Sequence, residues 1–355
     1  MLISLYEYGT KHGKSSDTMR RMAEKGLLVT AQKIGRNWVV DSEEEYPVKK
    51  RTLDCNSSEF IPANNSIVDP SDLLNRVFEA DCLEKMKDIP SKTIDMILCD
   101  LPYGMTQNAW DSYVPLNLLW EQYLRIIKTN GVIVLTSHGV FTAKLILSQE
   151  KLFKYKWVWE KSKPTNFLNA KKQPLRKHED VCVFYQKQPT FNPQMTQGAA
   201  YDKGVRKNQL SGCYGNFEPV HVFSDGERYP TDILYVKTAE SEGAVLHPTQ
   251  KPIELGRYLI RTYTNPGDVV LDNTCGSGSF LVAALLEGRN FIGIEKNEDV
   301  ALFKSGKIDY IEVSVSRLCE AWRALPSNVR ASLYISPMIE SFMWEEKHGA
   351  LCSGK

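Results

Sequence analysis

An acid, a proline and an aromatic ring stand directly after one apolar run. The run Ile94–Cys99 is followed by Asp100-Leu101-Pro102-Tyr103. A short buried strand that ends in this cluster would deliver one carboxylate, one backbone carbonyl and one flat ring to the carboxyl edge of a sheet, where α/β proteins bind ligands. We interpret the cluster as a pocket for a planar ring that bears an amino group. Because such a pattern arises by chance in roughly one chain in three of this length at average residue usage, the interpretation needs a second part of the site.

That second part is a glycine-containing turn at residues 273–279, between a buried run and an apolar helical run. Gly276, Ser277 and Gly278 allow a ligand to approach the backbone and the amino end of the helix closely. Glu295 ends the next buried run, where a ribose would lie. The turn lacks the third glycine of a dinucleotide fingerprint and no Walker lysine follows it, so a nucleoside ligand without phosphate fits best. S-adenosylmethionine is the common ligand of this kind.

The elements that must position these residues alternate between strands and helices. Strands are expected at 76–81, 94–99, 132–137, 269–272 and 291–295, and helices at 83–89, 115–128, 252–263, 280–287 and 310–318. This alternation is typical of a parallel, doubly wound α/β sheet. Residues 155–185 change to period two around the basic loop 161–177, which indicates an antiparallel pair at the sheet edge.

Composition divides the chain into six segments. They are a small module at 1–48, a polar linker at 49–75, the first half of the main domain at 76–187, an insertion at 188–245 rich in Gly, Pro, Asn and Gln, the second half at 246–325, and an extension of unknown role at 326–355. In the first module, helices at 4–12 and 18–24 precede two β runs around Gly35. This order resembles the winged helix-turn-helix domains of excisionase and activator proteins, which places Arg20 and Arg21 on a DNA-recognition helix. A helical protein-interaction cap is the alternative.

Charge is nearly balanced along the whole chain but uneven locally. The net charge is +1, yet residues 151–187 hold ten Lys/Arg against three Asp/Glu, and residues 11–40 hold seven against two. Such local basic faces are expected where a protein holds nucleic-acid phosphates, and a solvated charged surface is the alternative. The densest group is assigned to phosphate contacts: Lys171, Lys172, Arg176 and Lys177.

Composition also bears on compartment and metals. No apolar run approaches the roughly 18 to 20 residues of a membrane span, and the first residues lack the zones of a signal peptide. We therefore expect a cytoplasmic protein. The eight cysteines show no Cys-x-x-Cys or His/Cys cluster with zinc spacing, so free thiols and no metal are expected.

Together these motifs resemble the amino-group DNA methyltransferases of the β order, in which the catalytic motif precedes the target-recognition region and the cofactor motif comes last. The resemblance covers about residues 76–318 and rests on Asp81-Cys82, Asp100-Leu101-Pro102-Tyr103, His247-Pro248-Thr249-Gln250-Lys251-Pro252, Leu271-Asp272-Asn273-Thr274-Cys275-Gly276-Ser277-Gly278-Ser279 and Gly293-Ile294-Glu295-Lys296. It implies a Rossmann-like, S-adenosylmethionine-dependent fold with a circularly permuted motif order, of the phage or restriction-modification type, and hence a protein of a bacterial cell or a phage-infected host.

The resemblance also implies roles for the catalytic cluster. The Asp100 carboxylate and the Leu101 carbonyl would accept hydrogen bonds from an exocyclic amine, Pro102 would shape the turn, and Tyr103 would stack on a flipped base. Such an amine is a poor nucleophile and must be held in line with the sulfonium methyl. A target inside a duplex must first be extruded, at a cost of a few kcal/mol.

Cofactor roles follow from the same resemblance. Glu295 would accept from the ribose hydroxyls, Asp81 would bond the adenine amine, and Thr249 and Lys251 would lie by the methionine carboxylate. The residues assigned to the cofactor are Asp81, Cys82, Asp100, Thr249, Lys251, Asp272, Asn273, Cys275, Gly276, Ser277, Gly278, Glu295 and Lys296. Two features depart from many relatives: Asn273-Thr274 replaces Pro-Phe, and about residues 300–309 are additional.

The resulting prediction is a site-specific DNA adenine-N6 methyltransferase that acts on double-stranded DNA, with residues 188–245 choosing the sequence. The aspartate at the start of the catalytic motif favours adenine in this family, and cytosine N4 is the alternative. A transcription regulator with a non-catalytic methyltransferase fold is the rival of another class, and RNA or protein methylation stays open. A homodimer, a restriction partner and the recognition sequence are left open too.

Three tempting groups receive other interpretations. A core role is expected for Trp157 and Trp159, with at most one facing the pocket. His178 and Glu179 are expected to make a structural bond, because methyl transfer to an amine needs no histidine base. Cys275 lacks an adjacent base, so its place in a ligand turn calls only for a small side chain.

Overall fold

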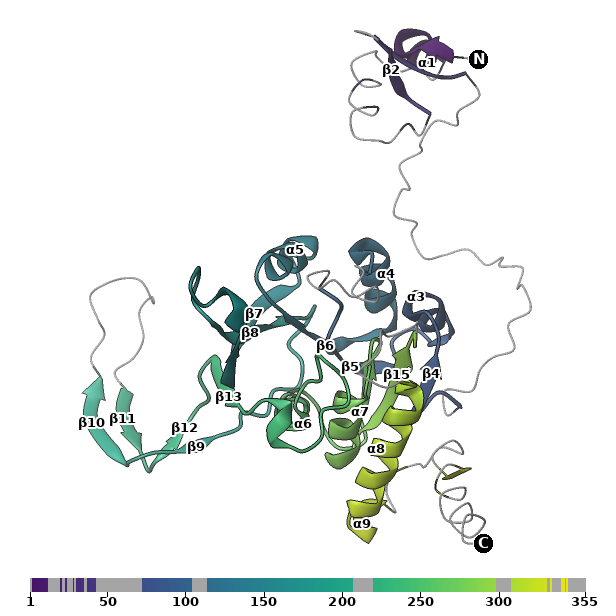
Figure 1. Ribbon diagram of the computed structural model, residues 1–355. Coiled ribbons are helices and arrows are strands. Elements are labelled where there is room, and N and C mark those ends of the chain that lie inside the picture. The colour runs from purple at the N-terminus through teal and green to yellow at the C-terminus, as the bar shows by residue number, and fades with distance from the viewer. Residues whose placement is uncertain are drawn as a thin grey trace, which may run out of the picture. The chain divides into compact units, whose positions relative to one another are not determined.

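The computed structural model describes residues 2–11, 20, 23, 28, 30–34, 37–42, 72–103, 114–206, 220–297, 308–330, 333, 340–341 and 343. The chain falls into two compact units, Met1–Asn65 and Ser66–Lys355 (Figure 1). Within the described ranges, no helix is long and apolar enough to cross a membrane.

The first unit contains a three-stranded antiparallel sheet and one described helix. Its elements are β1 (Leu2–Ser4), α1 (Leu5–Lys11), β2 (Gln32–Ile34) and β3 (Asn37–Asp41), in the strand order β1-β3-β2. The β runs expected around Gly35 are confirmed as an antiparallel pair. The first helix begins later than expected, because residues 2–4 pair with β3.

The expected recognition helix lies mostly outside the described residues. Arg20 is exposed and helical, and Arg21 lies outside the described residues. The expected linker at 49–75 also lies outside them for most of its length, apart from residues 72–75.

The second unit is built on an eight-stranded sheet. Its strands are β4 (Arg76–Glu79), β5 (Ile94–Cys99), β6 (Ile127–Ser137), β7 (Phe153–Thr165), β8 (Arg176–Phe184), β13 (Ile233–Val236), β14 (Val269–Asp272) and β15 (Asn290–Glu295). The spatial order is β13-β7-β8-β6-β5-β14-β15-β4. The strands from β6 to β4 are parallel, whereas β8 runs antiparallel to both β6 and β7. The sheet is therefore mixed: the strands from β6 to β4 are parallel, as expected from the alternation of strands and helices, and the antiparallel pair expected over 155–185 lies beyond them.

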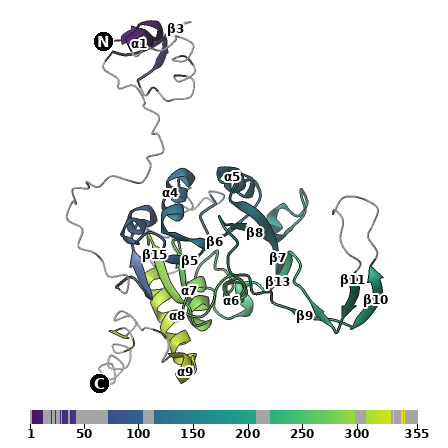
Figure 2. The ribbon, with the colours of Figure 1, turned by 180° about the vertical axis from the view of Figure 1, so that it is seen from behind.

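Helices cover both faces of this sheet, as the opposite views in Figures 1 and 2 show. One face carries α3 (Cys82–Lys85), α4 (Leu116–Ile126) and α5 (Val140–Ser148), and the other carries α6 (Ile253–Tyr263), α7 (Ser279–Leu286) and α8 (Tyr310–Ala324), with the short α9 (Ser327–Arg330) after α8. Along β5, Met96 and Leu98 pack into the core below α6 to α8, while Ile97 and Cys99 pack into the core below α3 to α5. Two buried faces explain why this strand is apolar at every position except Asp95, and the doubly wound arrangement is confirmed.

The boundary between α4 and β6 differs from the expectation, and α8 continues to Ala324 although its end was expected at 318. The helix expected at 115–128 ends at Ile126, and β6 begins directly at Ile127 rather than at 132. Ile127 is buried and pairs with Ile94 of β5. A β-branched side chain that already belongs to the sheet thus ends the helix before the Asn130-Gly131 pair.

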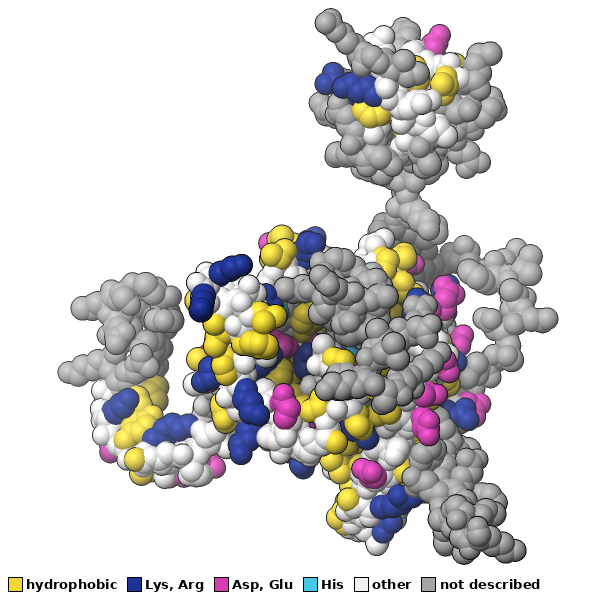
Figure 3. Space-filling model, viewed as in Figure 1, with side chains coloured by type: hydrophobic (Ala, Val, Ile, Leu, Met, Phe, Trp, Pro, Cys, Tyr) yellow, Lys and Arg dark blue, Asp and Glu magenta, His cyan; other side chains and the backbone are white. Residues whose placement is uncertain are grey.

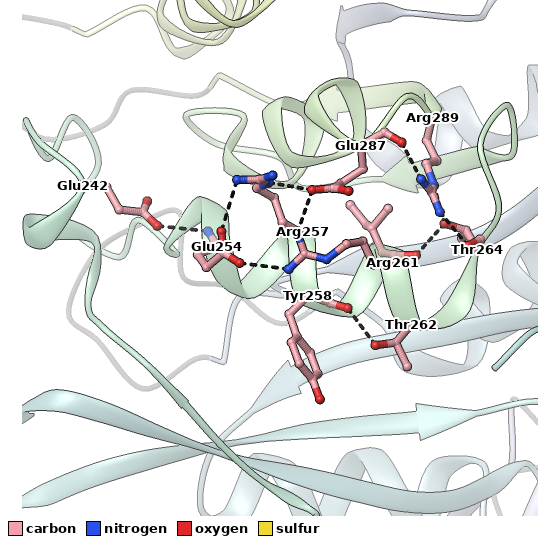
Figure 4. Close-up of polar contacts among 10 residues, drawn as sticks. Glu242, Glu254, Arg257, Tyr258, Arg261, Thr262, Thr264, Glu287 and Arg289 are labelled. Carbon is pink, nitrogen blue, oxygen red and sulfur yellow. Dashed lines mark hydrogen bonds and ion pairs between the residues drawn. The ribbon is translucent and has the colours of Figure 1, made fainter. Parts of the chain in front are cut away.

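Ion pairs fix α6 to the end of α7 (Figure 4). Arg257 Nε lies 2.6 Å from Glu287 Oε1, and Arg261 Nη1 lies 2.9 Å from the same oxygen. Arg261 also pairs with Glu254 at 3.0 Å. At the other end of α6, the Glu242 carboxylate accepts two backbone N–H groups of its first turn, at 2.7 and 3.0 Å. Because α6 is held at both ends, the segment directly before it has a fixed place at the sheet edge.

Residues 188–245 form an arm and one further strand of the sheet. The pairs β9 (Thr196–Gln197) with β12 (Glu227–Arg228) and β10 (Tyr201–Arg206) with β11 (Val220–Ser224) project away from the central sheet (Figures 1 and 2). The segment then returns as β13, parallel to β7, so β13 forms the edge outside the confirmed antiparallel pair β7–β8. These strands have two to six residues and mostly exposed side chains. They therefore lack the alternation of apolar and polar residues by which a strand can be predicted from sequence.

Candidate active site

The carboxyl ends of β4, β5, β14 and β15 surround a cavity of about 360 Å³. The acid–proline–aromatic cluster after β5 and the glycine turn after β14 both line it, because these two strands are neighbours in the sheet. Of the residues assigned from sequence, those in the cavity wall are Asp81, Cys82, Asp100, Leu101, Pro102, Tyr103, Thr249, Lys251, Asp272, Asn273, Cys275, Gly276, Ser277, Glu295 and Lys296. The two stretches thus form one site.

The Asp100 carboxylate is held from three sides. Its Oδ1 accepts hydrogen bonds from the Tyr103 hydroxyl at 2.8 Å and from the Thr136 hydroxyl, and its Oδ2 accepts from Lys251 Nζ at 2.6 Å. The Asp100 carbonyl accepts from the Thr274 hydroxyl at 3.0 Å, which ties β5 to the turn after β14. Two carboxylate oxygens offer about four acceptor positions, so Asp100 keeps room for one further donor.

Lys251 lies between two carboxylates. It is only 8% exposed, and its Nζ is 3.4 Å from Glu179 Oε2 as well as 2.6 Å from Asp100. The other Glu179 oxygen is bonded by Lys161. Burial alone would lower the pKa of Lys251, but the Asp100 and Glu179 charges outweigh burial and raise it. These four side chains, named the charge quartet below, are Asp100, Glu179, Lys161 and Lys251.

Glu179 is a member of the site that the sequence prediction did not recognise. Burial would raise its pKa, but Lys251 and Lys161 bring the pKa down to about 2, so it stays ionised. The sequence did contain a pattern that could have identified it. Glu179 lies two residues before Val181 and four before Val183, which are both buried on β8. An acid at the buried period of a strand indicates a buried partner. The expected bond of Glu179 is therefore an ion pair within the site, whereas His178 is exposed.

The Tyr103 ring packs on Phe141 of α5, with ring centroids 5.1 Å apart and planes inclined by 27°. Burial first, and then the nearby Asp100 charge, raise the pKa of its hydroxyl, which therefore stays protonated and donates to Asp100. One face of the ring is thus covered by Phe141 while the ring borders the cavity.

The glycine turn is braced by α8. The Gly276 N–H donates to Glu295 Oε2 at 2.7 Å, and the Gly276 carbonyl accepts from the Ser314 hydroxyl at 2.7 Å. Arg317 donates to the Ser277 carbonyl at 2.5 Å. Gly278 does not line the cavity; its φ is +75°, and a Cβ there would lie 3.0 Å from Ser314. Gly278 therefore allows close packing of the turn against α8.

Two polar side chains near the turn are buried. Burial raises the pKa of Asp272 to about 8, and its Oδ1 accepts a long bond, 3.4 Å, from the Thr274 N–H. The Tyr310 hydroxyl borders the cavity and has no hydrogen-bond partner within the described part of the chain. A ligand with polar groups would satisfy such a hydroxyl.

Thr249 and His247 are engaged with one another. The Thr249 N–H is 3.2 Å and its hydroxyl 3.1 Å from His247 Nδ1, and the His247 ring lies against Tyr310 with centroids 4.6 Å apart. Burial lowers the pKa of His247 to about 4, so its imidazole is neutral at physiological pH and Nδ1 accepts from the Thr249 N–H. His247 therefore forms an uncharged part of the wall.

Asp81 is an N-cap as well as a wall residue. Its Oδ1 accepts from the backbone N–H groups of Leu83 at 2.9 Å and Glu84 at 3.3 Å, the first turn of α3. Its Oδ2 lies 4.0 Å from Lys296 Nζ. One carboxylate oxygen therefore remains available to a ligand. Cys82 beside it is buried, which raises the pKa of its thiol to about 11 and keeps it neutral.

A model of the family described as DNA methylase matches residues 94–302, more than half of the 355-residue chain. The chain belongs to the DNA methylase family. Its relatives include the type II methyltransferase M.HinfI of Haemophilus influenzae, 28% identical over 304 residues that cover 75% of this chain and 74% of the relative. The DNA adenine methyltransferase YhdJ of Escherichia coli (strain K12) is 29% identical over 263 residues, covering 68% and 82%.

Solved structures with a similar chain include the M1.HpyAVI–SAM complex. It is 23% identical, with a TM-score of 0.47, and the match covers 68% of this chain and 98% of that one.

Away from the cavity, the basic residues of this DNA methylase differ in their surroundings. Lys171 and Lys172 are exposed in the loop between β7 and β8. Lys177 is exposed but pairs with Glu160 at 2.7 Å, and Arg176 is half-buried. Of these four residues, Lys177 is thus engaged in an ion pair, and the assignment of the group to phosphate contacts stays a prediction.

The tryptophans and cysteines follow the expectations. Trp157 and Trp159 are both buried in the core and neither lines the cavity; Trp157 donates to the Tyr263 hydroxyl at 2.7 Å. The core role of both is confirmed. The described cysteines are buried free thiols: Cys82, Cys99, Cys182, Cys275 and Cys319.

Proposed function

We propose that this DNA methylase transfers the methyl group of S-adenosylmethionine to the N6 amine of adenine in double-stranded DNA, at one recognition sequence. The observation that carries the proposal is the cavity itself, where the Asp100 cluster and the glycine turn with Glu295 face one another. Two relatives add support, because one is named a type II methyltransferase and another a DNA adenine methyltransferase.

The cavity wall fits the cofactor. Glu295 and the Asp81 oxygen that does not cap α3 would accept from the ribose hydroxyls and the adenine amine. The Tyr310 hydroxyl, which has no hydrogen-bond partner among the described residues, would bond a polar group of the ligand. The turn from Cys275 to Ser277 borders the methionine part, with Asp272 beneath it. Bound there, S-adenosylmethionine supplies an electrophilic methyl group on a sulfonium.

The remaining acceptor position of Asp100, together with the Leu101 carbonyl, would take the two amine hydrogens and aim the nitrogen at the methyl. Lys251 lies 2.6 Å from the other Asp100 oxygen and would hold the carboxylate in place as an acceptor for the amine. The amine would give up one proton to solvent as the nitrogen–methyl bond forms and the sulfur–methyl bond breaks. Tyr103, which packs on Phe141 and has Lys251 Nζ 5.6 Å from its ring centroid, would stack on the extruded base. Hydrogen bonding and stacking in the cavity offset part of the cost of extruding that base.

Lys251 takes a different role from the one inferred by resemblance. Its ammonium is bound by Asp100 and Glu179, so we assign it to the amine side of the cavity rather than to the methionine carboxylate. Thr249 likewise bonds His247, and its part at the carboxylate is limited to lining the wall.

The insertion 188–245 would choose the sequence. On its arm, the Tyr201 ring carries Lys203 Nζ 4.8 Å and the Arg228 guanidinium 4.5 Å from its centroid. Aromatic rings interleaved with cations suit a nucleic-acid surface. The arm stands apart from the catalytic sheet, which lets it vary without disturbing the cavity.

The first unit would add DNA contacts as a winged helix-turn-helix. The order of its elements, β1, α1 and then the β2–β3 pair, supports this assignment. Arg20, which lies between α1 and β2 in the sequence, is helical and exposed. The order of motifs, catalytic before cofactor, supports the circularly permuted arrangement.

Sequencing that maps modified bases in DNA from cells expressing the full chain tests the function. We expect N6-methyladenine at one sequence, and unmodified DNA from cells that express Asp100→Ala. N4-methylcytosine would contradict the adenine assignment. Unmodified DNA with the wild-type chain would favour the regulator with a non-catalytic fold.

A further inference from the structure

The β7–β8 hairpin extends well beyond the active-site edge of the sheet. Because β8 is antiparallel to both β6 and β7, β7 ends at the same edge as β5 and its catalytic cluster. Trp157 pairs with Val181, which pairs with Thr136, and Thr136 bonds Asp100. Trp157 is therefore level with Asp100. The eight residues of β7 after it reach about 25 Å further at about 3.3 Å per residue.

The tip of this hairpin is a built turn. Asn166 has a left-handed backbone, φ +70°, and its Oδ1 accepts from Asn169 Nδ2 at 2.7 Å. The 3₁₀ turn η3 (Phe167–Asn169) follows, and the Asn169 carbonyl accepts from the Lys172 N–H at 2.8 Å. This turn holds two large apolar side chains outward: Phe167 is 75% exposed and Leu168 is 83% exposed.

Positive charge surrounds these two side chains. Residues 162–177 hold five Lys/Arg and no Asp/Glu, and Lys163, Lys171 and Lys172 are exposed. Figure 3 shows dark blue and yellow side chains side by side over this hairpin. Exposed apolar side chains flanked by lysines are complementary to DNA, because the apolar groups can contact the stacked bases while the lysines contact the phosphates on either side. This surface does not suit a second copy of the same basic tip, which it would repel.

We infer that Phe167 and Leu168 insert into the base stack next to the target base and fill the space that the base leaves. This inference rests on the proposed function, since it concerns DNA whose target base enters the cavity. Apolar side chains that enter a base step are a general means of opening a duplex. Here the wedge and the cavity lie on one edge of one sheet, so the same docked duplex meets both. Lys171 and Lys172 bind the phosphates that flank the opened step.

The test compares two duplexes that carry the sequence mapped in cells. In one duplex the target base is paired, and in the other it faces an abasic position, so that opening is already achieved. We expect the double variant Phe167→Ala/Leu168→Ala to lose at least about tenfold in kcat/KM on the paired duplex. On the abasic duplex the loss shrinks to about threefold or less, because the wedge is no longer needed. Affinity for S-adenosylmethionine stays unchanged in the variant.

Two further variants separate the wedge from charge and from general surface effects. Lys171→Gln/Lys172→Gln lowers affinity for both duplexes alike and reduces the slope of log affinity against log salt by about two. Val140→Ala/Leu147→Ala changes apolar side chains that are 70% and 73% exposed on α5, and it leaves both rates unchanged.

Equal losses of the Phe167/Leu168 variant on the two duplexes, or no loss on either, would overturn the wedge. A change of its mass in solution relative to the wild type would also overturn it, since the tip would then be a subunit contact. If the wild-type chain methylated neither duplex, the proposed function itself would be contradicted. That result can be distinguished from the outcomes that overturn the wedge, because those all require an active wild-type chain.

Discussion

At the scale of single residues, the charge quartet explains how the charged Lys251 can be buried beside the Asp100 carboxylate. Two cations and two anions balance within hydrogen-bond reach, and each carboxylate keeps contact with a lysine. Removing one partner of such a group leaves an uncompensated buried charge, which is costly. Glu179 does not line the cavity as the described residues form it, so we expect it to act through Lys251 as a positioning residue for Asp100.

Glu179→Gln should lower kcat by about tenfold or more, which corresponds to about 1.4 kcal/mol, while KM for S-adenosylmethionine changes little. Without the Glu179 charge, Lys251 should pair more strongly with Asp100 and compete with the substrate amine for the Asp100 carboxylate. Steady-state kinetics measures the split. Glu160→Gln is the matched control on the neighbouring strand, because its pair with Lys177 is exposed and should contribute about 1 kcal/mol or less. Equal kcat values for Glu179→Gln and wild type would refute the dependence.

Asp272 predicts a pH dependence of cofactor binding. Its pKa of about 8 means that the carboxyl is largely protonated at neutral pH in the free protein. A sulfonium cation favours the ionised form, so a proton leaves on binding, and affinity should rise between about pH 6 and pH 8 and then level off. Calorimetry in buffers of different ionisation enthalpy measures that proton. The demethylated product of the cofactor lacks the sulfonium charge, so its affinity should not change with pH over this range. The Asp272→Asn variant should show no pH dependence of affinity for either ligand. Identical slopes for the two ligands would disprove the coupling.

At the scale of elements, the site arises where β5 and β14 lie side by side and α8 braces the turn between β14 and α7. The sequence predicted both strands, since apolar runs that end in Asp100 and Asp272 are strong local signals. It could not predict the Glu179–Lys251 pair, which joins β8 to the segment before α6 across about 70 residues, because pairing over that distance leaves no local pattern. The role of α8 was missed for the same reason.

Gly278 tests the brace. Gly278→Ala introduces a left-handed alanine whose Cβ would lie 3.0 Å from Ser314, whereas Gly288→Ala, at φ +71° shortly after α7, meets nothing within 4 Å. Backbone strain alone should cost Gly288→Ala about 1 kcal/mol, and the clash should cost Gly278→Ala about 1–3 kcal/mol more, with weaker cofactor binding. Urea unfolding and cofactor titration measure both. Equal costs for the two variants would argue against close packing at Gly278.

At the scale of the whole molecule, the cavity belongs to one of two units. Every residue that lines it lies within Ser66–Lys355. Composition indicated this division through the polar stretch between the small module and the main domain. The course of residues 188–245 could not be foreseen, since the short exposed strands of the arm, and the return of β13 to the sheet, depend on pairing partners rather than on their own pattern.

Removal of residues 1–65 should leave the affinity for S-adenosylmethionine within about twofold of the full chain, because the cavity is complete without them. Affinity for duplex DNA should fall, and the salt slope should become shallower as phosphate contacts are lost. Titrations with cofactor and with duplex measure the two effects. Loss of cofactor binding would show that the first unit takes part in the site.

The most direct test of the two-part site follows one methyl group. The purified full chain is given methyl-labelled S-adenosylmethionine and a duplex with the mapped sequence, and the DNA is digested to nucleosides. With the wild type we expect the label in N6-methyl-2′-deoxyadenosine. With Asp100→Ala we expect at least about a thousandfold less label, because this variant lacks the carboxylate that accepts a hydrogen bond from the amine. Undiminished labelling with Asp100→Ala, or label on the N4 of cytosine, would contradict the proposed function.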